Sequence, residues 1–219
     1  IEEIIVTGDF RDIDLQKMPA SVTVMTAEDI KRRSAQHLEQ LLALAPNVNF
    51  SGGSSRTRYI QIRGIGERSQ FASPINPSVD TIIDDVDFSS IGSAGTLFDV
   101  ERVEVLRGPQ GTRYGANALA GIIAITSTAP SEDFNGYVES MVGNYDSWSL
   151  GAASGGALTD DLLYRASIQQ YKSDGYVDNT FLNRDDTNGF DEFTLRTKLR
   201  WLASDNVTID TSLFFIDID

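Results

Sequence analysis

The sequence has 219 residues, of which 41% are hydrophobic, and a formal net charge of −14. This hydrophobic content is ordinary for a folded protein, whereas the excess of acids disfavours general binding to nucleic acid or to anionic lipid surfaces. The chain contains no Cys and one His, which excludes disulfides and thiolate chemistry and leaves little material for Ser-His-Asp or multi-His sites.

No stretch approaches the roughly 18 consecutive apolar residues of a membrane-spanning helix, and no signal-peptide pattern opens the sequence. Two alternatives remain at this point. The protein is soluble, or its leader was removed and it meets the membrane as strands.

The first elements are predicted in residues 1–33. Residues 1–8, IEEIIVTG, contain a β-branched run that predicts a strand with no evident partner nearby. It is either an ordinary first strand or an extended peptide that pairs with the sheet edge of another protein. Residues 22–25 predict a second strand, and Thr26 followed by Glu28 and Asp29 predicts the N-cap and acidic first turn of a helix.

A second helix is expected from a cap at Ser34 to a stop at Pro46. Its apolar face consists of Leu38, Leu41, Leu42 and Ala45. His37 lies on or beside this face, and because the chain has no other His we interpret it as a packing or surface residue without a catalytic role.

Two further strands are predicted in residues 59–63 and 81–88. In the first, Ile60 and Ile62 share one face. The second contains three acids, Asp84, Asp85 and Asp87. They could form an acid and base pair, but acids of this kind are far more common in turns, and we favour the turn interpretation.

Residues 106–127, LRGPQGTRYGANALAGIIAITS, form a glycine-rich corner between strand candidates at 101–107 and 121–126. A phosphate-binding loop is one interpretation, because glycine-rich loops after strands expose backbone N–H groups. A P-loop requires Gly-Lys-Ser/Thr, however, and no Lys lies near this corner. We therefore favour a tight structural turn.

From Phe134 onward, segments of about ten residues with period-two alternation replace the helical pattern. Five strands are predicted, at residues 137–143, 148–158, 163–172, 192–202 and 207–218. Short turns alternate with a long acidic loop at 173–191, as in the wall of a transmembrane β-barrel. A soluble antiparallel sheet is the alternative, because its strands alternate in the same way. Residues 185–189, DDTNG, hint at calcium but fail the strict EF-hand motif.

The order of six blocks resembles the plug domain of TonB-dependent outer-membrane receptors. The blocks are EEIIVTG, SVTVMTAEDIKRR, EQLLALAPNV, IQIRGIG, VDTIIDDVDF and DVERVEVLRGPQGTRYGANALAGIIAITS. The resemblance implies a TonB-box segment at 1–10, an α+β plug domain at 11–130, and at 131–219 the first antiparallel strands of a transmembrane β-barrel. Five strands cannot close such a barrel, so we expect the missing strands C-terminal to Asp219.

The resemblance also implies active uptake of a scarce nutrient: a ferric siderophore or similar chelate, cobalamin, or an oligosaccharide. The implied partners are TonB with its inner-membrane complex of ExbB and ExbD, the outer-membrane lipid and an extracellular ligand. No enzyme activity, cofactor or metal is implied. The alternatives are a soluble or cell-surface β-rich binding protein and, less favoured, an enzyme using the acids at 84–87.

Three sets of site residues follow from the resemblance. The expected TonB-binding residues are Glu3, Ile4, Ile5, Val6 and Thr7. The expected charges that hold the plug to the barrel are Arg63, Glu104 and Arg107. The expected ligand contacts, on loops turned outward, are Arg56, Arg58, Glu67, Arg68, Phe71 and Phe88.

Overall fold

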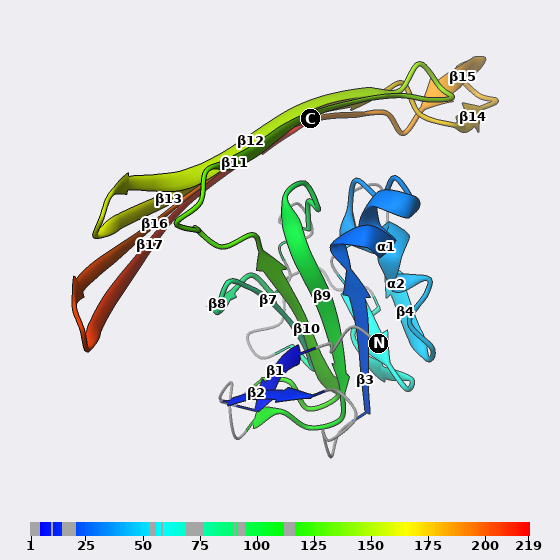
Figure 1. Ribbon diagram of the computed structural model, residues 1–219. Helices are drawn as coiled ribbons and strands as arrows, with labels where there is room; N and C mark the ends of the chain where they lie inside the picture. Colours follow the sequence, from blue (N-terminus) through cyan, green and yellow to red (C-terminus); the bar gives the residue numbers. More distant parts are fainter. Residues whose placement is uncertain are drawn as a thin grey trace. The chain divides into compact units, whose positions relative to one another are not determined.

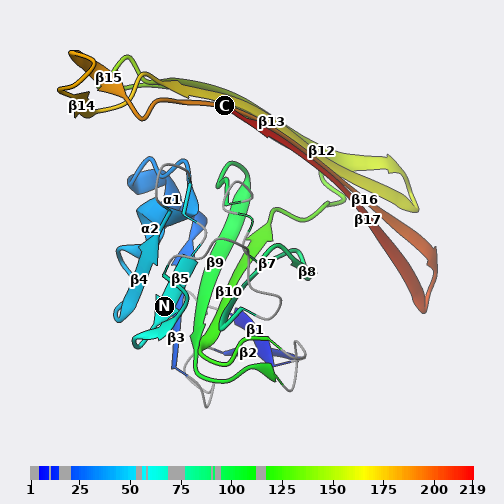
Figure 2. The same cartoon turned by 180° about the vertical axis from the view of Figure 1, so that it is seen from behind.

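The computed structural model of the chain describes residues 5–9, 11–14, 21–52, 56–57, 59–68, 77–89, 91, 95–111 and 117–219. The chain divides into two compact units, Ile1–Ser127 and Thr128–Asp219. No helix in these described ranges is long and apolar enough to cross a membrane. The elements of each unit can be followed in Figures 1 and 2.

A five-stranded mixed sheet forms the centre of the first unit (Figure 1), with the strand order β3-β9-β10-β7-β8. The strands are β3 (Ser21–Thr26), β7 (Val79–Ile83), β8 (Val86–Asp87), β9 (Val100–Arg107) and β10 (Gly121–Ser127). β10 pairs in parallel with β7, and the other neighbours are antiparallel. The strands predicted at 101–107 and 121–126 are confirmed.

Helix α1 (Ala27–Arg32) begins at the predicted cap. The Thr26 Oγ1 atom accepts a hydrogen bond from the Asp29 N–H at 3.4 Å, and the Asp29 carboxylate accepts one from the Thr26 N–H at 3.1 Å. This reciprocal capping box satisfies two backbone donors that a helix start otherwise leaves open.

Helix α2 (Leu38–Leu42) is shorter than predicted, and its N-cap is His37. The expectation of a cap at Ser34 was wrong, because Ser34 adopts a left-handed φ of 51° in the turn after α1. The Gln40 side chain supplies the capping acceptor, at 2.6 Å from the Gln36 N–H and 3.2 Å from the His37 N–H. The predicted apolar face is confirmed, since Leu38, Leu41, Leu42 and Ala45 are all buried.

The described part of the first unit also contains two smaller sheets. One has the order β4-β5-β6, with β4 (Val48–Ser51), β5 (Tyr59–Ile62) and β6 (Ile65–Gly66). All four β5 side chains are buried, so the predicted alternation is absent there. The other is the antiparallel pair β1 (Ile5–Asp9) and β2 (Arg11–Asp14), with Val6 opposite Ile13. The first strand therefore has a partner in its own chain.

The strand predicted at 81–88 is a hairpin of β7 and β8. Asp84 and Asp85 form its turn with φ of 48° and 66°, values that Asp tolerates better than most residues. The Asp84 carboxylate accepts hydrogen bonds from the Ser127 N–H at 2.9 Å and from its hydroxyl at 2.7 Å. The interpretation as turn residues is confirmed for Asp84 and Asp85, whereas Asp87 lies on β8.

The glycine-rich corner continues the β9–β10 pairing beyond the strand ends. The Gly108 N–H donates to the Ala120 carbonyl at 2.8 Å, and the Gln110 N–H donates to the Ala118 carbonyl at 3.0 Å. At Gly121 a Cβ atom would lie 2.3 Å from the Leu106 carbonyl oxygen, so this position requires glycine for close backbone approach.

The second unit is an antiparallel sheet in which neighbours in sequence are neighbours in space, in the order β11-β12-β13-β16-β17. The strands are β11 (Asn135–Val142), β12 (Trp148–Thr159), β13 (Leu162–Ser173), β16 (Phe190–Ser204) and β17 (Val207–Ile218). All five predicted strands are confirmed. The loop after β13 holds a small hairpin, β14 (Val177–Asn179) and β15 (Arg184–Thr187), that the sequence did not predict.

Candidate functional site

The register of the second unit gives its sheet one apolar face and one polar face. Ala152, Ile168, Leu195 and Phe215 lie in one row across four strands. The adjacent row, one residue later on β12 and β16 and one residue earlier on β13 and β17, lies on the opposite face. It consists of Ala153, Ser167, Arg196 and Phe214. The first face continues with exposed Trp201, Ile209 and Leu213. A broad exposed apolar face of this kind needs a lipid or protein cover.

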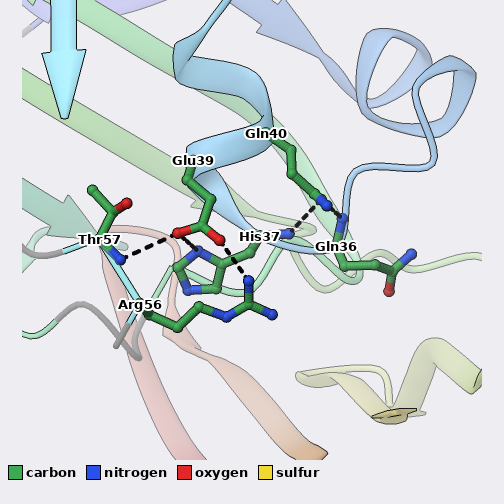
Figure 3. A network of polar contacts seen from close by, with 6 residues as sticks. All are labelled: Gln36, His37, Glu39, Gln40, Arg56 and Thr57. Carbon is green, nitrogen blue, oxygen red and sulfur yellow. Dashed lines mark hydrogen bonds and ion pairs between the residues drawn. The ribbon is translucent and has the colours of Figure 1, made fainter. Parts of the chain in front are cut away.

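In the first unit, the carboxylate of Glu39 on α2 binds the connection between β4 and β5 (Figure 3). One oxygen accepts from Arg56 Nη1 at 2.5 Å, and the other accepts from the Thr57 N–H at 3.1 Å. The Nδ1 atom of His37 lies 3.7 Å from the second oxygen. Burial alone would raise the pKa of Glu39, but the charges of His37 and Arg56 and the Thr57 hydrogen bond hold this pKa below its ordinary value.

This network changes the interpretation of Arg56 but not that of His37. Arg56 is only 6% exposed and is paired with Glu39, so the structure gives it an internal partner where we expected a ligand contact. His37 is 1% exposed and lies against Gly95, where a Cβ atom would come within 2.8 Å of the imidazole. The interpretation of His37 as a packing residue is confirmed.

Of the other expected ligand contacts, Glu67, Arg68 and Phe88 lie in the described ranges. Arg58 and Phe71 lie outside those ranges. The Glu67 carboxylate accepts from the Ser78 N–H at 3.1 Å and from its hydroxyl at 2.9 Å. Arg68 is exposed and Phe88 is half-buried.

The three expected plug charges occupy different environments. Arg107 is buried and donates from Nη2 to Thr23 Oγ1 at 2.6 Å and from Nε to the Pro46 carbonyl at 3.1 Å. Burial and the nearby charge of Arg63 lower the pKa of Arg107. Glu104 is 1% exposed and accepts from Arg102 Nε at 2.9 Å. Arg63 lies exposed in the turn between β5 and β6, with a φ of 54°.

A buried acid, Asp80, lies near the start of β7, at the end of the β7–β8 hairpin opposite its turn. It is 2% exposed, and Ser89 Oγ donates to its carboxylate at 3.3 Å. Burial, with the neighbouring charges of Asp87 and Glu67, raises the pKa of Asp80 to about 6. The described ranges contain no group of three or more His, Cys, Asp or Glu residues that could hold a metal ion.

Three of the expected TonB-binding residues, Ile5, Val6 and Thr7, lie on β1, where Ile5 and Val6 pair with β2. Glu3 and Ile4 lie outside the described ranges. Sequence reasoning missed the pairing of Glu39 with Arg56 and of Arg102 with Glu104. The second pair was detectable in principle, because residues two apart on a strand share a face.

Comparison with known proteins identifies the family. The family described as "TonB-dependent Receptor Plug Domain" matches residues 14–122. The pesticin receptor of Yersinia pestis is 32% identical over 188 residues, which cover 85% of this chain and 27% of the relative. The vitamin B12 transporter BtuB of Vibrio vulnificus is 26% identical over 208 residues, which cover 91% of this chain and 32% of the relative.

A solved structure extends the likeness to both units. The ferric yersiniabactin uptake receptor FyuA from Yersinia pestis matches with a TM-score of 0.79 and 28% identity, over 91% of this chain and 32% of that chain. The chain thus spans between a quarter and a third of the length of these relatives. The chain belongs to the TonB-dependent outer-membrane receptors, with their plug domain followed by antiparallel strands that match those of their solved structures.

Proposed function

We propose that the protein carries out TonB-dependent active uptake of a scarce nutrient across the bacterial outer membrane, with the plug unit gating the lumen of a barrel. One observation carries this proposal: a plug domain is followed by a sheet with one apolar and one polar face. A sheet in the wall of a barrel needs these two faces, because lipid covers one and the aqueous lumen contacts the other.

The ligand class that we propose is a ferric siderophore or a similar iron chelate. The likeness to a receptor for ferric yersiniabactin uptake, over both units, supports this choice. Cobalamin is the second candidate, supported by the likeness to the vitamin B12 transporter. An oligosaccharide stays a less supported prediction.

Growth of a deletion strain tests the ligand class directly. The strain is grown with iron supplied only as ferric siderophores, with cobalamin as the limiting nutrient, or with oligosaccharides as the carbon source. We expect a growth defect on one or more ferric siderophores that the wild-type copy restores. A defect confined to cobalamin would replace the first candidate by the second, and normal growth on all three would contradict uptake of these nutrients.

We further propose that β1 is the segment to which the periplasmic part of TonB, powered by ExbB and ExbD, adds a strand. β1 has one neighbour, β2, in a two-stranded sheet, and a strand with one paired edge can accept another strand on its second edge. Ile5→Pro and Val6→Pro remove donors from this strand. Binding of the full-length receptor to the TonB periplasmic domain should fall sharply, and undiminished capture by both variants would contradict the assignment.

That the charges of Arg63, Glu104 and Arg107 hold the plug to the barrel stays a prediction, which we call the latch hypothesis. The burial of Glu104 beside Arg102 supports a structural role, because removing one member of a buried charged pair leaves the other uncompensated. Glu104→Ala should lower plug stability and uptake. Unchanged stability and uptake in this variant would end the latch hypothesis.

A further inference from the structure

Asp80 places a carboxylate beside apolar side chains of the plug sheet. On β7 it shares a face with Ile82, and its partner in the parallel pairing with β10 is Ile122. Ile82 and Ile122 pack in a buried cluster with Ala118. Asp80 is itself 2% exposed, so its carboxylate lies at the border of a region that solvates an ionised group poorly.

The strand next to Asp80 is short and lies at an edge of the sheet (Figure 1). β8 pairs with β7 at two positions, Ile82 with Asp87 and Ile83 with Val86. Beyond them, the Phe88 N–H donates to the carbonyl of Thr81 at 2.8 Å. An edge strand of two residues has few backbone hydrogen bonds of its own, so side-chain contacts contribute a large share of what holds it.

Ser89 supplies those side-chain contacts and bridges two acids. Its Oγ atom donates to the Asp80 carboxylate at 3.3 Å and accepts the Thr81 N–H at 3.0 Å. Its N–H donates to the Asp87 carboxylate at 2.8 Å. The end of the β8 region is therefore bound to β7 through a residue that two carboxylates share.

These carboxylates repel each other when both are ionised. Asp87 lies on the same face of the sheet as Asp80, because it pairs with Ile82. Burial, followed by the charges of Asp87 and Glu67, raises the pKa of Asp80 to about 6. The Glu67 carboxylate is itself held by Ser78.

A base on this face of the sheet, Arg102, is bound elsewhere. Its Nε atom donates to Glu104 at 2.9 Å, and Nη1 pairs with Glu101. All three lie on β9, which β10 separates from β7. Two carboxylates therefore offset the charge of Arg102, and little of it acts on Asp80.

Protonation of Asp80 changes both the charge and the hydrogen bonding at Ser89. An ionised carboxylate only accepts hydrogen bonds, whereas the neutral acid also carries an O–H donor. The repulsion from Asp87 disappears at the same time. Because the folded-state pKa is raised from 3.8, this stabilisation is full below pH 3.8 and is lost as the pH rises through about 6.

We propose that Asp80, Asp87 and Ser89 form a pH-sensitive switch that holds residues 86–89 against β7 in mild acid and loosens them near neutral pH. We call residues 86–89 the switch segment. Its biological meaning rests on the proposed function, since the segment contains Phe88, an expected ligand contact, and nutrient binding would then depend on the pH of the medium. The movement itself depends on neither ligand nor TonB.

The test measures the mobility of a nitroxide spin label by electron paramagnetic resonance. The label is attached to a full-length receptor whose one Cys is Ile91→Cys; these 219 residues contain no other. Ile91 is 52% exposed, and its N–H donates to the Phe88 carbonyl at 3.0 Å, so the label reports on the switch segment. Its mobility should rise between about pH 5 and about pH 7, with a midpoint near the pKa of Asp80.

Three variants identify the groups responsible. Asp80→Asn should abolish the transition and keep the label immobile throughout, because the amide is neutral and can donate. Asp87→Asn should keep the transition but lower its midpoint by about half a pH unit or more, because one repelling charge is removed. Asp84→Asn is the matched control: Asp84 also accepts a backbone N–H and a hydroxyl, both from Ser127, and its midpoint should equal that of the wild type.

Four results would overturn the proposal: a wild-type mobility that does not change with pH, a transition that persists in Asp80→Asn, an unchanged midpoint in Asp87→Asn, or an equal shift in Asp84→Asn. If Asp80→Asn does not fold, the midpoint of Asp87→Asn decides. Failure of the proposed function is detected separately, as absent nutrient uptake by the wild-type receptor at every pH, and the label mobility does not depend on that measurement.

Discussion

The two units of this chain differ in how far apart in sequence their contacts lie. In the second unit, the strands of the five-stranded sheet pair in the order in which they occur in the chain, and β14 pairs with β15 in a separate hairpin. In the first unit, β3 pairs with β9, and Arg107 binds Thr23 and Pro46 across 84 and 61 residues. The fold of the sheet is therefore specified by the alternation of side chains along each strand. The fold of the plug is specified by buried packing and polar contacts between residues far apart in the sequence.

The two units also differ in the pattern of buried side chains along their strands. Ile122, Ile123 and Ile125 of β10 are all buried, so consecutive residues on both faces of this strand are covered. The strands of the second unit alternate in burial along much of β12 and β13. Substitutions in the plug should therefore change stability by disturbing side-chain packing. The effect of substitutions in the sheet should depend on whether lipid or water contacts the substituted face.

The largest effect is expected in the plug core. Ile122 is fully buried against Ile82 and Ala118, and Ile122→Ala should cost about 2–5 kcal/mol of plug stability because it removes buried methyl groups and leaves a cavity. Val138 of β11 is 75% exposed, and Val138→Ala should cost less than about 1 kcal/mol. Thermal unfolding of the purified full-length receptor measures both, and equal losses would remove the distinction between the units.

The second-largest loss of stability is expected on the second unit, and it distinguishes a membrane-spanning barrel wall from a soluble sheet. Leu213 is 61% exposed on the apolar face, and Leu213→Arg should cost about 2–4 kcal/mol if that face contacts lipid near the bilayer midplane. Ser212 neighbours it on the opposite face, and Ser212→Arg should have little effect. Folding into lipid vesicles, followed by heat-dependent gel migration, measures the difference. Equal behaviour of the two variants would favour the soluble alternative.

A smaller loss is expected at the Glu39 contact. Glu39→Gln removes the anion that Arg56 and the Thr57 N–H bind, so it should cost about 1–3 kcal/mol. The pKa of Glu39 is lowered in the folded state from an ordinary value of 4.5. Its stabilisation is therefore present above pH 4.5 and lost as the pH falls through the lowered pKa. The unfolding free energies of wild type and variant should converge in acid. A difference that stays constant with pH would contradict a lowered pKa for Glu39.

The smallest effect has the opposite pH dependence. The pKa of Asp80 is raised from 3.8 to about 6, so between these values the folded state binds the proton more tightly than the unfolded state does. Plug stability should fall as the pH rises through this window. Asp80→Asn should be more stable than wild type by on the order of 1 kcal/mol near neutral pH and equal to it in acid.

The exposed turn residue Asp205 offers the matched control for Asp80. Asp205→Asn in the β16–β17 turn should leave the pH profile of plug unfolding as in the wild type. If Asp80→Asn kept the wild-type profile too, then burial of this carboxyl would not control the pH dependence.

The sequence by itself determined the features that depend on neighbouring residues. Period-two alternation predicted the five strands of the second unit, because side chains of a strand point alternately to two faces. Thr26 and Asp29 predicted the start of α1, since both partners of a capping box lie within one turn. The acids at Asp84 and Asp85 were recognised as turn residues for the same local reason.

Only the tertiary structure decided the partners of charged side chains and short strands. Arg56 looked like an open loop residue in the sequence, but α2 brings the Glu39 carboxylate to it. The pairing of β1 with β2 and the position of Arg107 at Pro46 were equally invisible. A charge or a strand edge can be satisfied by many residues of the chain, and folding selects one of them by burial and geometry that no local pattern records.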